Sequence, residues 1–270
     1  MSEDLRAIAA DNERIIAAGG YQAPSGHYVS LASEVRAAVE GTRMYGPEPV
    51  AVSTRSGGAG VIRVTGESSL EAARRMVDAD SEAVAVLNFA SARNPGGHYL
   101  LGARTQEEAL CRASALYTTL LAVPEYYEYH RSTPDPFYSD RVILSPAVPV
   151  FRDDLGTLLE SPYAVGFLTA PAPRSNVIAQ EQPGEVHRVP AVLATRAERI
   201  LETAAGYRRL VLGAWGCGAY GNDPGVVAGI FRALLADGGR FDGHFDEITF
   251  AILDRTPGET TLSAFRKALG

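Results

Sequence analysis

Apolar, β-branched runs alternate with helical patterns along most of the chain. Six such runs predict strands at residues 61–64, 84–90, 142–144, 164–170, 210–215 and 248–253. Several are almost continuously apolar, as expected for strands buried on both faces of a sheet. Helical periodicity predicts four intervening helices, at residues 69–77, 106–121, 190–205 and 224–236. Strands alternating with helices predict an α/β fold whose sheet is mostly parallel.

The first part of the chain has a different pattern. Residues 5–18 and 30–40 are amphipathic with a helical period, and a turn-like segment at residues 23–26 separates them. The glycine-rich segment 56–60 is the nearest feature to a domain boundary. We therefore expect a helical N-terminal accessory segment over residues 1–55 and the main domain over residues 56–270. The two parts are expected to form one structural unit, and the segment is equally consistent with a loop inside it.

Composition is that of an ordinary globular protein, with 46% hydrophobic and 21% charged residues. No apolar run approaches the roughly 20 residues that a membrane span needs, and the acidic start argues against a signal peptide. Cys111 and Cys217 make no disulfide framework and are expected to be small, reduced core residues. These features predict a cytoplasmic protein with no membrane partner.

The formal net charge of −7 argues against general nucleic-acid binding, which needs clustered Lys and Arg. It does not exclude an anionic ligand. Backbone N–H groups and helix N-termini can hold a diphosphate with few cationic side chains. In mostly parallel sheets ligands bind outside the carboxyl ends of the strands, so two loops there become the candidates for chemistry.

The first loop follows the predicted strand 84–90. The paired glycines Gly96 and Gly97 allow close approach of backbone to a ligand. The adjacent carboxylates Glu107 and Glu108 then open a helix.

A structural interpretation of these carboxylates competes with the catalytic one. Thr105 and Glu108 have the spacing of a capping box, in which Glu108 reaches back to the Thr105 N–H. A helix N-terminus also favours the charged carboxylate and lowers its pKa, which suits an acid catalyst poorly. Burial or a nearby diphosphate would reverse that shift.

The second loop, residues 213–222, follows the predicted strand 210–215 and is rich in glycine. It leads into a helix with Asp223 as a suitable N-cap and Pro224 at the first helical position. A strand, a glycine-rich loop and a helix N-terminus together form a phosphate cradle in physical terms. The alternative is a tight strand-to-helix turn. Tyr220 is interpreted as a core or lid aromatic residue, or as a ring that packs on a ribose.

Together the two loops resemble those of the compact bacterial poly(ADP-ribose) glycohydrolases, which are built on a macrodomain. That family's mark is a glycine triplet followed by Gln-Glu-Glu. The corresponding residues here are Asn94, Pro95, Gly96, Gly97 and His98, then Gln106, Glu107 and Glu108. Residues 216–224 resemble the family's diphosphate loop, and residues 145–153, 169–173 and the N-terminal helices extend the resemblance over nearly the whole chain. It implies a three-layer α/β/α fold with a mixed sheet.

The resemblance also implies roles for individual residues. Glu108 would be the general acid at the ribose–ribose bond, Glu107 would hold the adjacent ribose hydroxyls, and Gln106 would support the pair. Asn94 and Tyr220 would contact the terminal ribose. The diphosphate would be surrounded by Gly96, Gly97, Gly216, Cys217, Gly218, Ala219 and Gly221.

The implied reaction passes through an oxocarbenium-like state, as in glycoside hydrolysis generally. Neighbouring glutamates cannot flank a bond at the separations of the usual two-carboxylate mechanism. The family is thought to let the substrate's own diphosphate position the attacking water. The resemblance implies no metal and no cofactor, with poly(ADP-ribose) or ADP-ribosylated macromolecules as partners and ADP-ribose as product.

His98 departs from the family pattern, because it replaces the third glycine. Its side chain adds bulk and loses the freedom of glycine at positive φ. It either points outward, or narrows the pocket and changes activity or the accepted linkage. Two other functions therefore stay open: an ADP-ribose-binding reader without catalysis, and a hydrolase of single ADP-ribosyl groups. A cysteine hydrolase using Cys217 and His98 lacks an evident third, orienting group. Residues 65–67 and the loop at Arg255 are candidates for adenine contact.

Overall fold

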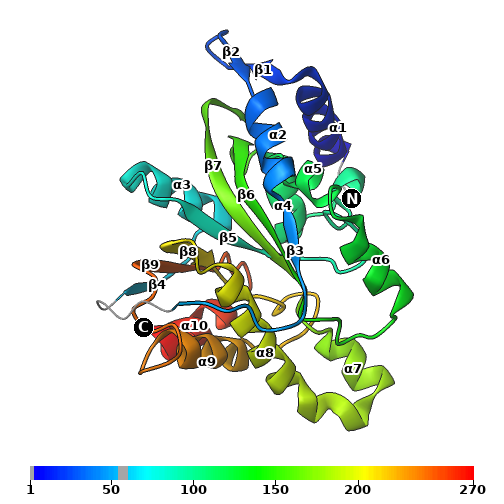
Figure 1. Cartoon of the computed structure of the whole chain (residues 1–270), viewed down its shortest axis with the longest axis vertical. Coiled ribbons are helices and arrows are strands. Elements are labelled where there is room, and N and C mark those ends of the chain that lie inside the picture. The colour runs from blue at the N-terminus through cyan, green and yellow to red at the C-terminus, as the bar shows by residue number, and fades with distance from the viewer. Residues whose placement is uncertain (1–2, 54–59) are drawn as a thin grey trace.

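The computed structural model describes residues 3–53 and 60–270, and it is built around a seven-stranded sheet (Figure 1). Its strand order is β3-β6-β7-β5-β8-β9-β4. The strands span β3 Arg43–Tyr45, β4 Val61–Thr65, β5 Val84–Phe89, β6 Val142–Arg152, β7 Leu158–Ala170, β8 Arg209–Leu212 and β9 Glu247–Ala251. Strands β7, β5, β8, β9 and β4 pair in parallel, whereas β6 is antiparallel to both β3 and β7. The prediction of an α/β fold with a mixed, mostly parallel sheet is confirmed.

Helices cover both faces of the sheet, which gives three layers. One face packs against α1 Glu3–Ala18, α2 Ala32–Gly41, α3 Ser69–Ala79, α4 Gln106–Ala113, α5 Leu116–Leu120 and α6 Pro124–Ser132. The other packs against α7 Ser175–Glu181, α8 Val189–Thr203, α9 Pro224–Leu235 and α10 Thr260–Leu269. Strand β5 alternates accordingly: Val84 and Val86 face the first core, and Ala85 and Leu87 face the second. No helix in the described part of the chain is long and apolar enough to cross a membrane.

The N-terminal segment takes part in the main sheet. After α1, a hairpin of β1 Gly20–Gln22 and β2 Tyr28–Ser30 leads to α2, and β3 then pairs with β6. This segment therefore contributes helices to one layer and an edge strand to the sheet. The predicted domain boundary between residues 55 and 56 stays a prediction. It falls within residues 54–59, which lie outside the described residues together with most of the glycine-rich segment.

One predicted helix is wrong. The pattern over residues 106–121 predicts a single helix, but α4 ends at Ala113 and α5 begins at Leu116. Between them Ser114 forms an isolated bridge with Val150 of β6, and its hydroxyl accepts a hydrogen bond from the Leu116 N–H. The break turns the chain onto the sheet, a tertiary contact that periodicity does not contain. The strand predicted over residues 210–215 likewise ends early, at Leu212.

Candidate active site

Two loops lie next to each other at the carboxyl-terminal ends of the parallel strands. The first follows β5 and the second follows β8, and these strands are parallel neighbours with Ala85 opposite Leu210. Their carboxyl ends therefore lie side by side, as predicted for a ligand site. The first loop connects through a 3₁₀ turn, η1 Tyr99–Leu101, to α4, and the second leads directly to α9.

Glu107 lies in the first turn of α4 with only 1% of its surface exposed. Its carboxylate points back to the end of β5: Oε2 accepts a hydrogen bond from the Ser91 N–H at 2.7 Å, and Oε1 accepts one from Asn88 Nδ2 at 3.2 Å. Asn88 also donates to the Thr169 hydroxyl at 3.1 Å, so both of its amide hydrogens are engaged. Neighbouring strands β5 and β7 thus fix this carboxylate.

Burial decides the protonation of Glu107. It raises the pKa to about 8, and the nearby charge of Glu108 adds to the rise against the opposing hydrogen bonds from Ser91 and Asn88. The field of the helix N-terminus, which favours a charged carboxylate, is thus outweighed by desolvation at Glu107. Near neutral pH this side chain is mostly a neutral acid that can donate as well as accept.

Glu108 is also buried, and it is held by the loop. Its Oε1 accepts a hydrogen bond from the His98 N–H at 2.9 Å, and its Oε2 accepts one from the Thr105 hydroxyl. Thr105 is the N-cap residue of α4, but its side chain makes no capping hydrogen bond to the helix. The reciprocal capping box is therefore wrong, because the carboxylate turns toward the first loop instead of the Thr105 N–H.

Gly97 lies directly against both carboxylates. A Cβ atom there would come within 2.4 Å of Glu108 Oε1 and 3.1 Å of Glu107 Oε2, and its φ of +60° is left-handed. Gly96 is also left-handed, at φ +62°, and a Cβ would lie 2.9 Å from the Tyr117 ring. Both glycines are therefore required by space and by conformation.

His98, in contrast, occupies ordinary backbone space. Its φ is −111°, and the residue is exposed. The third position of the triplet therefore imposes no left-handed conformation in this chain. A side chain is accommodated there without backbone strain, while the His98 N–H still holds Glu108.

Gln106 and Asn94 have different surroundings. Gln106 accepts from the Phe89 N–H at 2.9 Å and donates to the Leu87 carbonyl at 2.8 Å, which ties the start of α4 to the end of β5. Asn94 is exposed, and its carbonyl accepts a hydrogen bond from the Gly97 N–H at 3.0 Å. Gln106 thus fixes the start of the helix that carries both glutamates, whereas the proposed ligand contact of Asn94 stays a prediction.

The second loop offers hydrogen-bond donors. No acceptor among the described residues receives the N–H groups of Gly218, Ala219 and Tyr220, and the first two residues are exposed. At Gly216, with φ +74°, a Cβ atom would lie 2.3 Å from Ala172. Asp223 caps α9 by accepting from the Val226 N–H at 2.8 Å. These three unpaired donors belong to the loop that precedes the helix, and successive N–H groups of a loop can bind an anion.

Tyr220 and Cys217 complete the second loop. The Tyr220 hydroxyl donates to the Ala90 carbonyl at 3.4 Å, which links the second loop to the first. Burial raises the pKa of Cys217 to about 12, so the group stays a thiol and is a poor nucleophile. This argues against a cysteine hydrolase.

Comparison with known proteins gives the family. Residues 9–153 match the family model described as microbial-type PARG, catalytic domain. The whole chain is 48% identical to a poly(ADP-ribose) glycohydrolase of Thermomonospora curvata, covering 99% of this chain and 100% of that one with a TM-score of 0.94. The chain belongs to the poly(ADP-ribose) glycohydrolase family.

Two further glycohydrolase structures contain ligands. A T. curvata enzyme bound to the inhibitor ADP-HPD is 50% identical, with 98% of this chain and 99% of that chain covered and a TM-score of 0.92. An enzyme of Deinococcus radiodurans in complex with ADP-ribose is 41% identical, with 89% and 98% covered and a TM-score of 0.79. No curated protein matched the chain.

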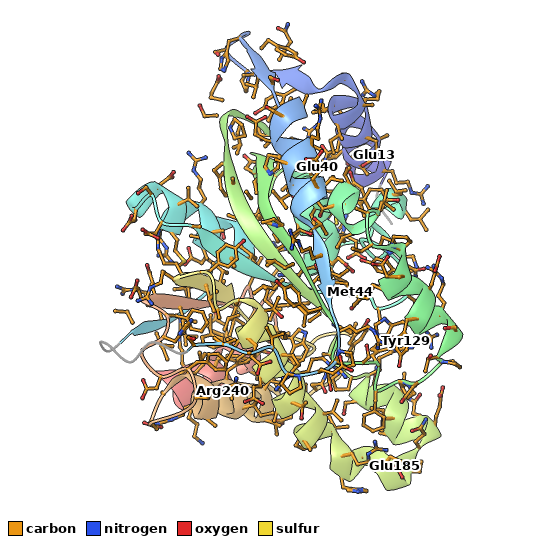
Figure 2. All side chains as sticks on the ribbon, viewed as in Figure 1. Glu13, Glu40, Met44, Tyr129, Glu185 and Arg240 are labelled. Carbon is orange, nitrogen blue, oxygen red and sulfur yellow. The ribbon has the colours of Figure 1, made fainter. Side chains whose placement is uncertain are left out.

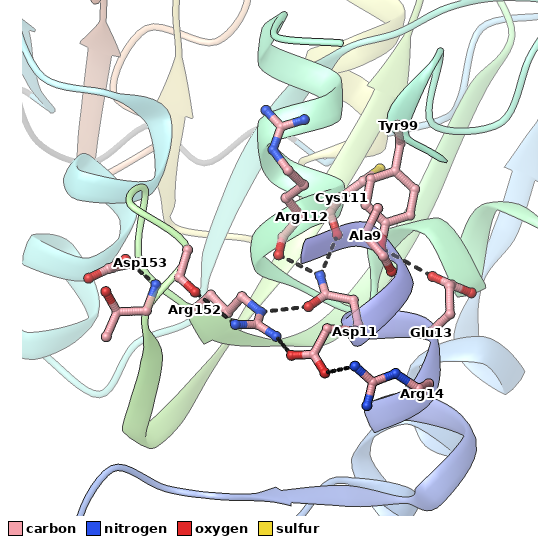
Figure 3. A network of polar contacts seen from close by, with 12 residues as sticks. Ala9, Asp11, Glu13, Arg14, Tyr99, Cys111, Arg112, Arg152 and Asp153 are labelled. Atoms are coloured by element: carbon pink, nitrogen blue, oxygen red, sulfur yellow. Dashed lines mark hydrogen bonds and ion pairs between the residues drawn. The ribbon is translucent and has the colours of Figure 1, made fainter. Parts of the chain in front are cut away.

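In this glycohydrolase the N-terminal helix α1 holds α4, the helix that carries Glu107 and Glu108 (Figure 3). Asn12, fully buried, donates to the carbonyls of Cys111 and Arg112 at the C-terminal end of α4. Arg152 of β6 donates in turn to Asn12 Oδ1 at 2.6 Å. In η1, which precedes α4, the Tyr99 hydroxyl donates to the Ala9 carbonyl of α1 at 3.2 Å. Sequence reasoning missed these anchors, and it also missed Asn88 and Ser91.

The candidate adenine-contacting residues lie at the neighbouring strand ends. Thr65 ends β4, which runs parallel to β9, and its hydroxyl is buried without a hydrogen-bond partner among the described residues. The carboxylate of Glu67 pairs with Arg75 at 2.6 Å and is engaged. Arg255 is exposed after β9. Adenine contact at these residues stays a prediction.

Proposed function

We propose that this glycohydrolase cleaves the ribose–ribose O-glycosidic bond at the terminus of poly(ADP-ribose) and releases ADP-ribose. One observation carries the proposal. The buried carboxylates of Glu107 and Glu108 lie against Gly97, which has no side chain, and their loop follows β5, the parallel neighbour of the strand that leads into the donor-rich second loop. A carboxyl pair beside a phosphate-binding loop suits a sugar–diphosphate substrate.

Glu108 is proposed as the general acid that protonates the departing ribose oxygen. The His98 N–H and the Thr105 hydroxyl fix the direction of its carboxyl group. A carboxyl group fixed in this way can act on the substrate without a search over rotamers. The reacting ribose passes through an oxocarbenium-like state.

Glu107 is proposed to hold the hydroxyls of the adjacent ribose. Because burial raises its pKa to about 8, it can donate to one hydroxyl oxygen and accept from another near neutral pH. The two neighbouring carboxyls therefore take different roles because their surroundings differ.

The diphosphate is proposed to bind the N–H groups of Gly218, Ala219 and Tyr220. Gly96 and Gly97 approach from the first loop, and Tyr220 and Asn94 lie beside the terminal ribose. Relatives that bind ADP-ribose and ADP-HPD support the binding of one terminal ADP-ribose unit between the two loops, at a site that we name the pocket. A cytoplasmic location and the lack of general nucleic-acid binding stay predictions.

The test compares the parent protein with Glu108→Gln on defined poly(ADP-ribose), with released ADP-ribose resolved by chromatography. We expect release by the parent and a loss of about 100- to 10,000-fold in the variant, the range of general acid catalysis. Glu34→Gln, at an exposed position on α2, is the matched control and should retain full activity. A parent that binds ADP-ribose but releases none would point to a reader, or to a hydrolase of single ADP-ribosyl groups.

A further inference from the structure

Beyond the pocket, arginines and tyrosines form a surface that continues from it. They come from α6, from the loop between α6 and β6, and from the two loops after β5 and β7, and each is at least partly exposed. Tyr129 lies on α6 near the edge of the molecule (Figure 2). We name this surface the arginine–tyrosine strip, and it consists of Arg93, Tyr129, Arg131, Tyr138, Arg141 and Arg174.

A series of rings connects the strip to the pocket. The centroid of Tyr138 lies 6.2 Å from that of Tyr220, the aromatic residue of the second loop. Tyr138 lies 5.8 Å from His130, and His130 lies 5.3 Å from Tyr129. Arg131 meanwhile donates to the Arg93 carbonyl in the first loop at 2.9 Å. The strip therefore begins at both loops of the pocket and leads away along α6.

The arginines of the strip lack carboxylate partners. No described Asp or Glu forms an ion pair with Arg93, Arg131, Arg141 or Arg174. Asp140, the nearest carboxylate in sequence to Arg141, is engaged with Arg196. Four arginines without an ion-pair partner among the described residues thus belong to the strip, although the net charge of the chain is −7.

Two further observations concern the surroundings of these guanidinium groups. Arg141 lies over the Tyr129 ring, 3.6 Å from its centroid, and Arg174 lies 5.9 Å from the centroid of Tyr220. The Nε atoms of Arg93 and Arg174 are buried and have no hydrogen-bond partner among the described residues. Buried donors of this kind are usually satisfied, so a missing acceptor is indicated.

We propose that the arginine–tyrosine strip binds the polymer units that precede the terminal ADP-ribose. This rests on the proposed function, since it assumes that the terminal unit fills the pocket. The leaving oxygen belongs to the preceding unit, which must then lie outside the pocket beside Glu108. Its adenine can stack on tyrosine rings and guanidinium planes, and its diphosphate can pair with the free arginines. An RNA strand shares this chemistry but has no terminal ADP-ribose for the pocket, so the polymer is favoured.

The experiment measures binding in a Glu108→Gln background, so that no turnover is needed. Arg131→Gln and Arg141→Gln are combined, and fluorescence anisotropy gives the Kd of labelled poly(ADP-ribose) and of ADP-ribose as a function of salt. We expect polymer binding to weaken about 10-fold at low salt and the slope of log K against log salt to fall by about 1.4, roughly 0.7 for each phosphate that an arginine no longer neutralises. Binding of ADP-ribose should change less than about twofold, because both arginines lie outside the pocket.

The matched control combines Arg36→Gln on α2 with Arg63→Gln on β4, two exposed positions away from the strip. It should leave both affinities unchanged. Equal losses for polymer and ADP-ribose, or no loss for the polymer, would overturn the proposal, as would competition by poly(A) as strong as by poly(ADP-ribose). Failure of the proposed function is a separate result: the parent would release no ADP-ribose, whatever the strip variants bind.

Discussion

The two loops after β5 and β8 differ in the hydrogen-bond partners of their backbone N–H groups. In the first loop, N–H groups of Ser91 and His98 are already bonded to the buried carboxylates of Glu107 and Glu108. In the second loop, three successive N–H groups from Gly218 to Tyr220 have no acceptor among the described residues. One loop is organised around its own acids, and the other is open to a ligand's acceptors. The comparison agrees with the proposal that the first loop carries the catalytic acid and the second loop binds the diphosphate.

The largest expected effect comes from filling the space beside the carboxylates. Gly97→Ala places a methyl group 2.4 Å from Glu108 Oε1 at a left-handed φ. We expect kcat to fall at least about 100-fold, because displacement of a catalytic group by about 1 Å costs that much. Steady-state release of ADP-ribose measures it. Activity within a few-fold of the parent would contradict the role of Gly97.

The second-largest effect is expected where Asn12 holds the C-terminal end of α4. Asn12→Ala leaves the carbonyls of Cys111 and Arg112 and the Arg152 Nε atom without their buried partner. We expect about 1–3 kcal/mol of destabilisation, with a several-fold loss in kcat at little change in KM. Arg14→Ala on the same helix removes only an exposed ion pair with Asp11 and is the control. Equal changes in kcat and KM would indicate that Asn12 does not position α4.

How far these features can be predicted from sequence differs between the loops. The alternation of strands and helices is enough to predict that both loops lie at the carboxyl ends of parallel strands, and Gly96 and Gly97 mark a close approach of the backbone. The anchor between Asn12 and Arg152 spans 140 residues, and no local pattern contains it. The burial that makes Glu107 a neutral acid, and the helix break at Ser114, are likewise products of packing on the sheet. Spacing alone favoured a capping box that the fold does not form.

A third prediction concerns pH. The folded-state pKa of Glu107 is raised from 4.5 to about 8, so the folded protein binds this proton more tightly than the unfolded chain. Its contribution to stability is therefore full below about pH 4.5 and is lost as the pH rises toward about 8. Glu107→Gln should flatten the decline in unfolding free energy between pH 5 and pH 8 by on the order of 2–4 kcal/mol. Urea unfolding at both pH values measures this, and parallel profiles for the two proteins would contradict it.

The smallest effect is expected in the second loop. A Cβ atom at Gly218 meets no atom within 4 Å, and its φ is not left-handed. Gly218→Ala keeps the N–H group that is proposed to bind the diphosphate, and its methyl group meets no protein atom, so we expect the Kd for ADP-ribose to change by less than about twofold. Calorimetric titration of ADP-ribose measures this change. A large loss of affinity would show that this loop is as tightly shaped as the first.

The most direct test measures two quantities for one preparation of the Glu108→Gln variant. They are the Kd for ADP-ribose, from a titration, and the rate of poly(ADP-ribose) hydrolysis. If the first loop carries the acid and the second carries the binding, the Kd stays within about threefold of the parent while release of ADP-ribose falls by about 100-fold or more. Hydrolysis at the parent's rate, or loss of binding in parallel with activity, would contradict the separation of the two loops and the role of Glu108.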